Sequence, residues 1–269
     1  MSFAAVNGIK LYYERHGDSG EPLVFVHGYT GDVTDWRPQT GEFAPDYQIL
    51  IMDLRGHGRS EAPPDRQSYT VALMTADVEK LTDHVGFGRY HLVGHSMGGG
   101  VAQEIALDQP EKLLSLTLED TAPKFELPAN DAMFEFRAKR MQLAQTEGMA
   151  AAATLELPWT PPHMPPERLQ EVNERLARMS ADAFIGAAQG LIDWQGTAGR
   201  LASILTPTLV IYGDLDAPAL VNASSLLAER IPNASLEVVP EAAHSPQWER
   251  PDLFNRALRR HLEANRSKS

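Results

Sequence analysis

The stretch GHSMGG, which places Ser96 between Gly94 and Gly98, has the residue types and spacing of a nucleophile on a sharp turn. An apolar run, HLVGHS, leads into the turn and a helical pattern, MGGGVAQEIA, follows it. We therefore expect a strand, a tight turn and a helix, with Ser96 at the helix N-terminus, where the dipole favours developing negative charge. Glycines on either side avoid the clash that a Cβ atom would cause there. The alternative interpretation is a structural glycine turn in which the serine has no catalytic role.

A serine hydroxyl is a weak nucleophile unless a base removes its proton. The segment VVPEAAHSPQWERP supplies His244 after one predicted strand, and LVIYGDLDAP supplies Asp216 after another. Loops at the carboxyl ends of parallel strands meet at one edge of a sheet, so both side chains are expected beside Ser96. The order Ser96, Asp216, His244 matches the order described for this kind of turn. Asp120, which ends the run LLSLTLED, is a competing candidate for the carboxylate.

Attack on a carbonyl group also requires hydrogen-bond donors for the oxyanion that forms. One candidate donor is the backbone N–H of Met97, the residue after the serine. The other is the backbone N–H of Tyr29, because the loop HGYTG ends the apolar run LVFVHG and turns toward a helix. The same loop is equally typical of an ordinary strand-to-helix turn.

These side chains need a scaffold, and the chain alternates short apolar runs with helical patterns. Near-continuous hydrophobicity is typical of strands that are buried on both faces of a parallel sheet. The runs are Leu23–Gly28, Tyr47–Leu54, His91–Ser96, Leu113–Asp120, Thr206–Asp214 and Ser235–Pro240. The helical patterns between and after them cover 70–85, 97–108, 220–231 and 251–262. The alternation predicts an α/β fold with a mostly parallel, doubly wound sheet.

Two parts of the chain depart from this alternation. The opening segment predicts an antiparallel hairpin at the edge of the sheet, with Asn7 and Gly8 as its turn. Between residues 122 and 200 there is no convincing strand. Helical patterns there cover 131–147, 167–179 and 181–194. We interpret 122–200 as a helical insertion, and 1–121 together with 201–269 as the core domain.

Composition argues against several classes of partner. The formal net charge is −12 over 269 residues, and an acidic surface repels phosphate backbones and anionic bilayers. No apolar run approaches ~18 residues and no signal peptide is recognised, so we expect a cytoplasmic protein without a nucleic-acid or membrane partner. The chain has no cysteine, which excludes disulfides, a thiol nucleophile and a thiolate-bound metal.

Taken together, GHSMGG, VFVHGYTG, DLRGHGRS, YGDLDAP and AAHSPQWERP resemble, in order, the motifs of the α/β-hydrolase fold family over about residues 3–263. The resemblance implies a serine hydrolase whose triad is Ser96, Asp216 and His244, with the amides of Tyr29 and Met97 as the oxyanion hole. It also implies that the insertion is a cap, or lid, over the site. No metal and no organic cofactor are implied.

Departures from relatives narrow the expected chemistry. Members that cleave carbon–halogen bonds or epoxides use an aspartate nucleophile, which Ser96 argues against. Hydrolases of carbon–carbon bonds usually have asparagine before the serine, and an aromatic residue or cysteine after the histidine, where this chain has His95 and Ser245. The motif DLRGHGRS resembles a structural loop of the family, so Asp53 and Arg55 are expected to belong to the scaffold.

The expected substrate is a small-molecule carboxylic ester with a small or medium, apolar acyl group. Methionine and aromatic residues in the insertion favour an apolar pocket, for which Trp36, Phe125 and Trp159 are the candidate residues. The alternative is that these residues form the core of the insertion itself, as we expect for most of them. The alternatives are a lactonase or a carbon–carbon hydrolase with the same triad, a cofactor-free haloperoxidase or perhydrolase, and a small-ligand receptor with slow turnover. The sequence leaves the oligomeric state open.

Overall fold

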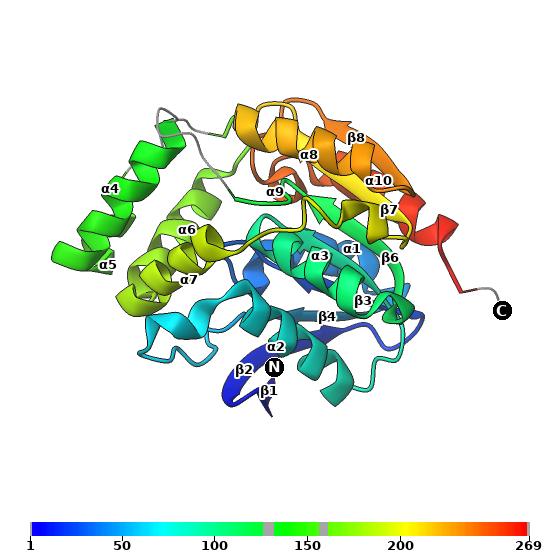
Figure 1. The fold of residues 1–269 in the computed structure, drawn as a ribbon, viewed down its shortest axis with the longest axis horizontal. Helices are drawn as coiled ribbons and strands as arrows, with labels where there is room; N and C mark the ends of the chain where they lie inside the picture. Colours follow the sequence, from blue (N-terminus) through cyan, green and yellow to red (C-terminus); the bar gives the residue numbers. More distant parts are fainter. Residues whose placement is uncertain (1, 126–131, 156–160, 268–269) are drawn as a thin grey trace.

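The computed structural model describes residues 2–125, 132–155 and 161–267, whose strands form one eight-stranded sheet (Figure 1). The strands are β1 (Ser2–Val6), β2 (Ile9–His16), β3 (Glu21–Val26), β4 (Tyr47–Met52), β5 (Tyr90–His95), β6 (Leu113–Glu119), β7 (Thr208–Gly213) and β8 (Ala234–Val239). Their order across the sheet is β1-β2-β4-β3-β5-β6-β7-β8. β2 is antiparallel to both β1 and β4, and the remaining neighbours are parallel. The predicted mostly parallel sheet is confirmed.

The predicted hairpin forms the edge of the sheet. Val6 pairs with Ile9 across a two-residue turn, in which Asn7 and Gly8 have φ angles of 48° and 77°. A type I′ turn requires positive φ at both central positions, and asparagine and glycine adopt it at low cost. The turn residues therefore set the register of β1 against β2.

Helices cover both faces of the sheet. The helices outside the insertion are η1 (Val33–Trp36), α1 (Arg37–Phe43), η2 (Arg66–Tyr69), α2 (Val71–His84), α3 (Met97–Asp108), η3 (Pro110–Lys112), α8 (Pro218–Arg230), α9 (Pro246–Glu249) and α10 (Pro251–Ala264). α2, α3 and α8 bury Val78, Val101 and Leu227 in one apolar core. α1 and α10 bury Phe43 and Phe254 in a second core. None of the described helices combines the length and apolarity needed to cross a bilayer.

The strands differ in burial according to their place in the sheet. β5, β6 and β7 are buried at every residue, which explains their continuous apolar runs. The expectation that the run in β8 is buried on both faces is wrong. β8 forms the other edge, and Leu236 and Val238 are each 43% exposed. An apolar run alone does not distinguish an edge strand from a central one, because the difference lies in the neighbouring strand.

The described residues between β6 and β7 form a helical insertion at one end of the sheet (Figure 1). Its helices are α4 (Ala132–Thr146), α5 (Met149–Ala153), α6 (Pro166–Arg178) and α7 (Ala181–Asp193), and the short η4 (Leu201–Ser203) follows them before β7. α4, α6 and α7 match the three predicted stretches. The insertion has its own small apolar core, in which Ala152, Leu176 and Phe184 are buried.

Buried charges hold the loop after β4, which contains DLRGHGRS. Arg55 forms a two-point ion pair with Asp77 on α2, with both N···O distances at 2.6 Å. Asp53 accepts the backbone N–H groups of Val33 and Arg59 at 2.7 and 2.8 Å. Asp53 and Arg55 thus bind neighbouring segments of the scaffold, as expected from the sequence.

Two buried imidazole rings join this loop to the end of β3. His27 accepts the N–H of Leu54 through Nε2 at 2.9 Å and donates from Nδ1 to the carbonyl oxygen of Gly28 at 2.7 Å. The His57 ring lies 5.1 Å from it, measured between centroids. Burial lowers the pKa of His27 and lowers that of His57 to about 3, so both rings are neutral at pH 7.

We expect Arg55→Met to lower the free energy of unfolding by about 3–5 kcal/mol, because the Asp77 carboxylate would stay buried without its cation. Urea-induced unfolding at pH 7 measures the change. The control is Arg178→Met, which removes a guanidinium that is 72% exposed and is expected to change stability by less than about 0.5 kcal/mol. An Arg55→Met loss no larger than that of the control would contradict a structural role for the buried pair.

Neutral buried histidines also predict sensitivity to acid. Since the pKa of His57 is about 3 in the folded protein and 6.5 otherwise, its stabilisation is complete above pH 6.5 and is lost as the pH falls toward 3. One such histidine contributes a slope of up to about 1.4 kcal/mol per pH unit in this window. We expect the free energy of unfolding, measured with urea from pH 7 downward, to fall less steeply in His57→Gln. A slope equal to that of the wild type would rule out a neutral His57 in the folded state.

Candidate active site

Ser96 lies on the turn between β5 and α3 with a strained backbone. Its φ and ψ angles are 51° and −115°, an unusual conformation for a residue with a Cβ atom. Its N–H donates to the carbonyl oxygen of Glu119 at 2.9 Å, and the Thr121 hydroxyl donates to its carbonyl oxygen at 2.7 Å. These hydrogen bonds anchor the strained turn to the end of the neighbouring strand β6.

Three glycines allow other backbone segments to approach this turn. A Cβ atom on Gly94 would lie 2.4 Å from the carbonyl oxygen of Gly98, and one on Gly98 would lie 2.3 Å from that of Val26. A Cβ atom on Gly28 would lie 3.1 Å from Ser96 Cβ, so the loop after β3 is packed against the serine. The steric reason expected for Gly94 and Gly98 is therefore confirmed.

The structure brings His244 and Asp216 to Ser96. His244 Nε2 lies 3.1 Å from Ser96 Oγ, and His244 Nδ1 lies 2.9 Å from Asp216 Oδ2. Asp216 follows β7 and also accepts the N–H of Ala217 at 2.7 Å, while His244 follows β8. Burial alone would raise the pKa of Asp216, but the charge and hydrogen bond of His244 outweigh it and the pKa is lowered. Asp216 is thus an ionised acceptor that orients the imidazole, with Nε2 directed at the serine.

Asp120, the competing carboxyl group, lies behind this chain of hydrogen bonds. It follows β6 with a positive φ of 40°, and its Oδ1 accepts the N–H of Gly213 at 3.1 Å. Burial, followed by the neighbouring Asp216 charge, raises the pKa of Asp120 well above its ordinary value, which favours its neutral form. One oxygen or ring nitrogen from each of Asp120, Asp216 and His244 lies within 4.8 Å of the others. The absence of a bound metal stays a prediction from the sequence.

The predicted oxyanion donors lie on either side of Ser96. Tyr29 follows Gly28 on the loop after β3 and lines the cavity above the serine. Met97 is the first residue of α3, where backbone N–H groups have no partner within the helix. The Met97 side chain is buried in the core. Both positions suit the predicted role, which stays a prediction.

His95 lies next to Ser96 in the sequence, but its ring packs beside the ring of His244. Its ring lies 5.0 Å from that of His244, and its Nε2 donates to the His244 carbonyl oxygen at 2.8 Å. Burial lowers the pKa of His95 to about 4, so the ring is neutral. His95 therefore fixes the backbone that carries the base and leaves the hydrogen bond to Ser96 with His244.

A cavity of about 650 Å³ extends from this site between the core and the insertion. Its walls include Gly28, Tyr29, Ser96, Asp216, His244 and Trp248 from the core, and Arg137, Arg140, Met164, Arg168, Val172 and Arg175 from the insertion. Apolar residues of the insertion, among them Met164, Leu169 and Val172, share this wall with four arginines. Met141, Met149 and Met179 pack into the core of the insertion.

Two of the residues predicted for the pocket lie elsewhere. Trp36 is completely buried in the core, where its ring centroid is 4.8 Å from that of Phe25. Phe125 packs on Trp194, with ring centroids 5.8 Å apart, and does not line the cavity. Neighbourhood in the sequence did not predict which way these rings turn. Trp159 lies outside the described residues.

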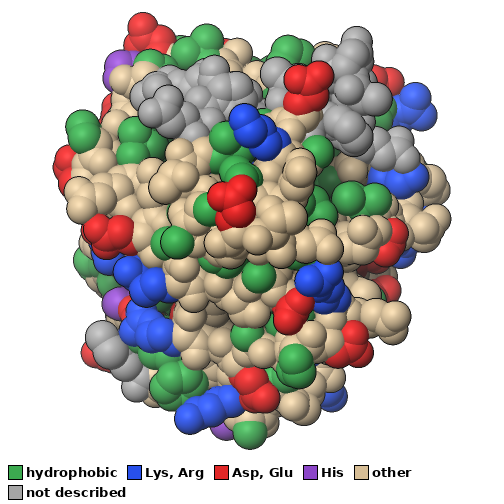
Figure 2. All heavy atoms as spheres, turned by 90° about the vertical axis from the view of Figure 1, so that its left-hand side faces the viewer, with side chains coloured by type: hydrophobic (Ala, Val, Ile, Leu, Met, Phe, Trp, Pro, Cys, Tyr) green, Lys and Arg blue, Asp and Glu red, His purple; other side chains and the backbone are tan. Residues whose placement is uncertain are grey.

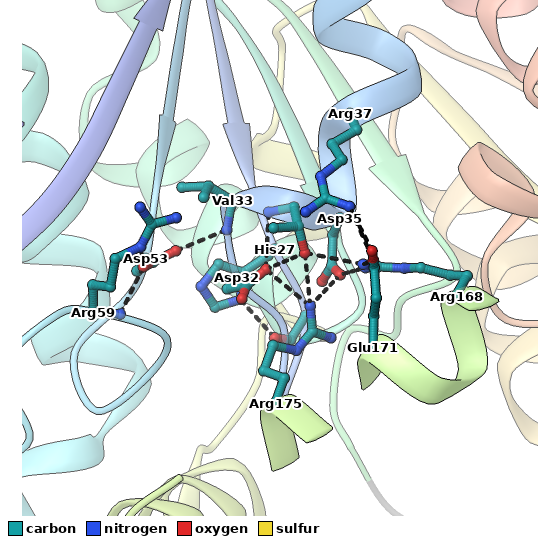
Figure 3. A network of polar contacts seen from close by, with 12 residues as sticks. His27, Asp32, Val33, Asp35, Arg37, Asp53, Arg59, Arg168, Glu171 and Arg175 are labelled. Carbon is teal, nitrogen blue, oxygen red and sulfur yellow. Dashed lines mark hydrogen bonds and ion pairs between the residues drawn. The ribbon is translucent and has the colours of Figure 1, made fainter. Parts of the chain in front are cut away.

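A network of charges joins the insertion to the loop after β3 (Figure 3). Figure 3 shows Arg168 and Arg175 reaching from the insertion toward Asp32 and Asp35. Arg175 Nη1 lies 2.7 Å from Asp35 Oδ1 and 2.9 Å from Asp32 Oδ1, and Arg168 pairs with Asp35 as well. Burial would raise the pKa of Asp35, but the two guanidinium groups lower it to about 2. The network thus fixes α6 against the segment that follows Tyr29.

Comparisons with known proteins agree with this architecture. The model of the alpha/beta hydrolase fold matches residues 21–251. The chain is 31% identical over 265 residues to the dihydrolipoyllysine-residue acetyltransferase component of an acetoin cleaving system from Cupriavidus necator, which covers 97% of this chain and 68% of that protein. The fold is similar to that of the enol-lactonase from Burkholderia xenovorans LB400, with a TM-score of 0.86, 27% identity and coverage of 97% and 100%.

A further solved structure resembles the chain to a similar degree. It is a thermophilic esterase from Thermogutta terrifontis with malate bound, which has a TM-score of 0.83, 28% identity and coverage of 96% and 95%. The family model spans the chain from the start of β3 to the start of α10. The chain therefore belongs to the α/β-hydrolase fold family.

Proposed function

We propose that this protein is a serine hydrolase that cleaves a carboxylic ester bond through an acyl-enzyme. The observation that carries the proposal is the chain of hydrogen bonds from Ser96 through His244 to Asp216 at the wall of the cavity. The names of the similar proteins support it, because acetyl transfer, lactone opening and ester cleavage all begin with attack on an acyl carbon. That shared step is what a serine and a histidine in contact are suited to perform.

In the proposed reaction, His244 Nε2 takes the proton of the Ser96 hydroxyl as Oγ attacks the ester carbonyl carbon. The amides of Tyr29 and Met97 hold the negative oxygen of the tetrahedral intermediate. Asp216 stabilises the imidazolium that forms, and His244 then gives its proton to the departing alcohol. Water enters by the same steps in reverse, with His244 as its base, and releases the carboxylic acid.

A lactone is the second candidate substrate, because the enol-lactonase of known structure is covered over its full length by this chain. A lactone is a cyclic ester, so the attack, the oxyanion and the protonated leaving oxygen are the same. The difference is that the alcohol stays attached to the acyl group. The site as proposed therefore needs no additional residue to open a lactone.

The insertion is proposed to act as a cap over this site, as part of the range 122–200, while 1–121 and 201–269 form the catalytic core. Residues of the insertion and of the core line the same cavity. A cap that encloses the ester excludes bulk water, and this strengthens the interactions of the oxyanion with its donors.

We expect wild-type protein to hydrolyse p-nitrophenyl esters with acyl chains from acetyl to octanoyl, and Ser96→Ala to lower kcat/KM by about 10⁴- to 10⁶-fold. Release of p-nitrophenol is followed by absorbance. Circular dichroism and the melting temperature of Ser96→Ala serve as the control for folding. Wild-type release no faster than that of Ser96→Ala at every chain length would reject the hydrolase and favour a ligand receptor.

Replacement of Asp216 and replacement of Asp120 are predicted to lower kcat to different extents. Asp216→Asn is expected to lower kcat by about 10⁴-fold, because the amide cannot hold the imidazole in the required tautomer. Asp120→Asn is expected to lower kcat by less than about tenfold, because the raised pKa of Asp120 favours a neutral group and the amide oxygen of asparagine can still accept the N–H of Gly213. The reverse order of the two losses would identify Asp120 as the acid of the triad.

A further inference from the structure

Arg140 on α4 is a cation of the cavity wall with an incomplete set of partners. It donates to the carbonyl oxygen of Leu155 at 2.8 Å, and its guanidinium carbon lies 4.2 Å from the ring centroid of Phe136. Its buried Nε–H meets no acceptor among the described residues. Burial lowers the pKa of Arg140 to about 10, and no described carboxylate opposes this shift. Arg140 is therefore charged at pH 7 and desolvated without an ion pair in the described chain.

The arginines on α6 are in a different position. Asp35 pairs with both Arg168 and Arg175, Asp32 pairs with Arg175, and Glu171 pairs with Arg168. A ligand anion would have to compete with these carboxylates, whereas at Arg140 it would meet no described competitor. The positive charge that the cavity offers to a ligand is therefore on α4.

Tyr29 connects this charge to the reacting centre. Its ring stacks on Phe184 with centroids 5.2 Å apart, and its hydroxyl donates to the Phe184 carbonyl oxygen at 2.8 Å. Burial raises the pKa of Tyr29, and the positive charges of Arg137 and Arg140 oppose that rise. The guanidinium of Arg140 therefore acts at the loop that lies against Ser96 and carries the proposed oxyanion amide.

The charges on the outer surface do not explain why an anion would bind in the cavity. Figure 2 shows the face of the molecule with the insertion, where basic and acidic side chains are interspersed over the described surface. The net charge of −12 repels anions at long range. Attraction of an anion thus arises inside the cavity, where a desolvated guanidinium interacts more strongly than one in water.

We propose that the substrate is an ester or lactone that carries a second, ionised carboxylate, and that Arg140 binds this carboxylate while the acyl carbon lies at Ser96. The inference rests on the proposed hydrolase function and adds the charge of the substrate to it. A carboxylate matches one guanidinium in charge and accepts hydrogen bonds in its planar geometry. A phosphate, with a charge of about −1.5 to −2 at pH 7, brings more charge than Arg140 balances.

The first test compares esters that differ only in this charge. The substrates are the monomethyl esters of succinic, glutaric and adipic acid, each against the analogue in which a neutral carboxamide replaces the free carboxylate. Acid release is followed in a pH-stat. For at least one chain length we expect wild-type kcat/KM to favour the charged ester by about 10- to 100-fold, the range of a charge-assisted hydrogen bond.

Arg140→Gln is expected to bring this ratio close to one, mainly by raising KM for the charged ester. The matched control is Lys139→Gln, which removes an exposed positive charge from the same helix and does not line the cavity. The control is expected to keep the wild-type ratio. A wild-type ratio of one at every chain length, or an unchanged ratio in Arg140→Gln, would overturn the proposal.

The second test does not depend on turnover. Isothermal titration calorimetry measures the affinity of the same monomethyl esters for Ser96→Ala, alone and combined with Arg140→Gln or Lys139→Gln. Arg140→Gln is expected to weaken binding of the charged ester about tenfold or more, and Lys139→Gln to leave it unchanged. Binding that depends on Arg140 without any hydrolysis by the wild type would reject the hydrolase but keep the anion site. Equal affinities in the two double variants would reject the anion site whatever the turnover.

Discussion

The geometry of the site depends on how closely three backbone segments approach one another at Ser96. The turn after β5, the first residues of α3 and the end of β3 meet where Gly94, Gly98 and Gly28 have no Cβ atoms. This close contact explains why a loop distant in sequence lies beside the serine, and why the proposed oxyanion amides flank it. The strained φ of Ser96 is part of the same arrangement, since the hydrogen bonds of Glu119 and Thr121 hold the turn in place.

The arrangement of the site also depends on the electrostatic balance among its buried carboxyl groups and arginines. Asp216 and Asp120 lie side by side, and burial together with the Asp216 charge raises the pKa of Asp120 well above its ordinary value, while His244 lowers the pKa of Asp216. The negative charge that remains is on Asp216, next to His244 Nδ1, where it would stabilise the imidazolium of the proposed reaction. At the opposite wall, the carboxylates of Asp32 and Asp35 compensate the arginines of α6. An acidic protein thus encloses a cavity in which carboxylates pair with the arginines of α6, whereas Arg140 on α4 has no ion pair among the described residues.

Much of this arrangement could be predicted because its signals are local. Asn7 and Gly8 favour one kind of turn, the apolar runs of β5 to β7 reflect burial on both faces, and the order of Ser96, Asp216 and His244 follows from the strands that precede them. The direction of Trp36 could not be predicted, because an irregular loop has no period that tells which face a side chain takes. The exposure of β8 depends on a neighbour that the sequence of β8 does not contain.

Local sequence patterns do not predict the ion-pair partners of the arginines in the cavity wall. Arg168 and Arg175 are seven residues apart, which places them on one face of a helix two turns apart, and this spacing is visible in the sequence. Their partners are not, since Arg175 and Asp35 are separated by 140 residues. The charges that the cavity wall carries beside its apolar residues are held by this long-range pairing, which composition and methionine content do not reveal.

The pairing of Asp32 and Asp35 with α6 also constrains how the chain can be recombined. Exchanging the insertion for a helical segment without Arg168 and Arg175 would leave these carboxylates without their cations in a largely buried environment, a loss of several kcal/mol by the measure of other broken buried pairs. The insertion is therefore not an independent module. A functional graft would have to transfer both arginines or remove both aspartates, and the second choice would release the segment that follows Tyr29.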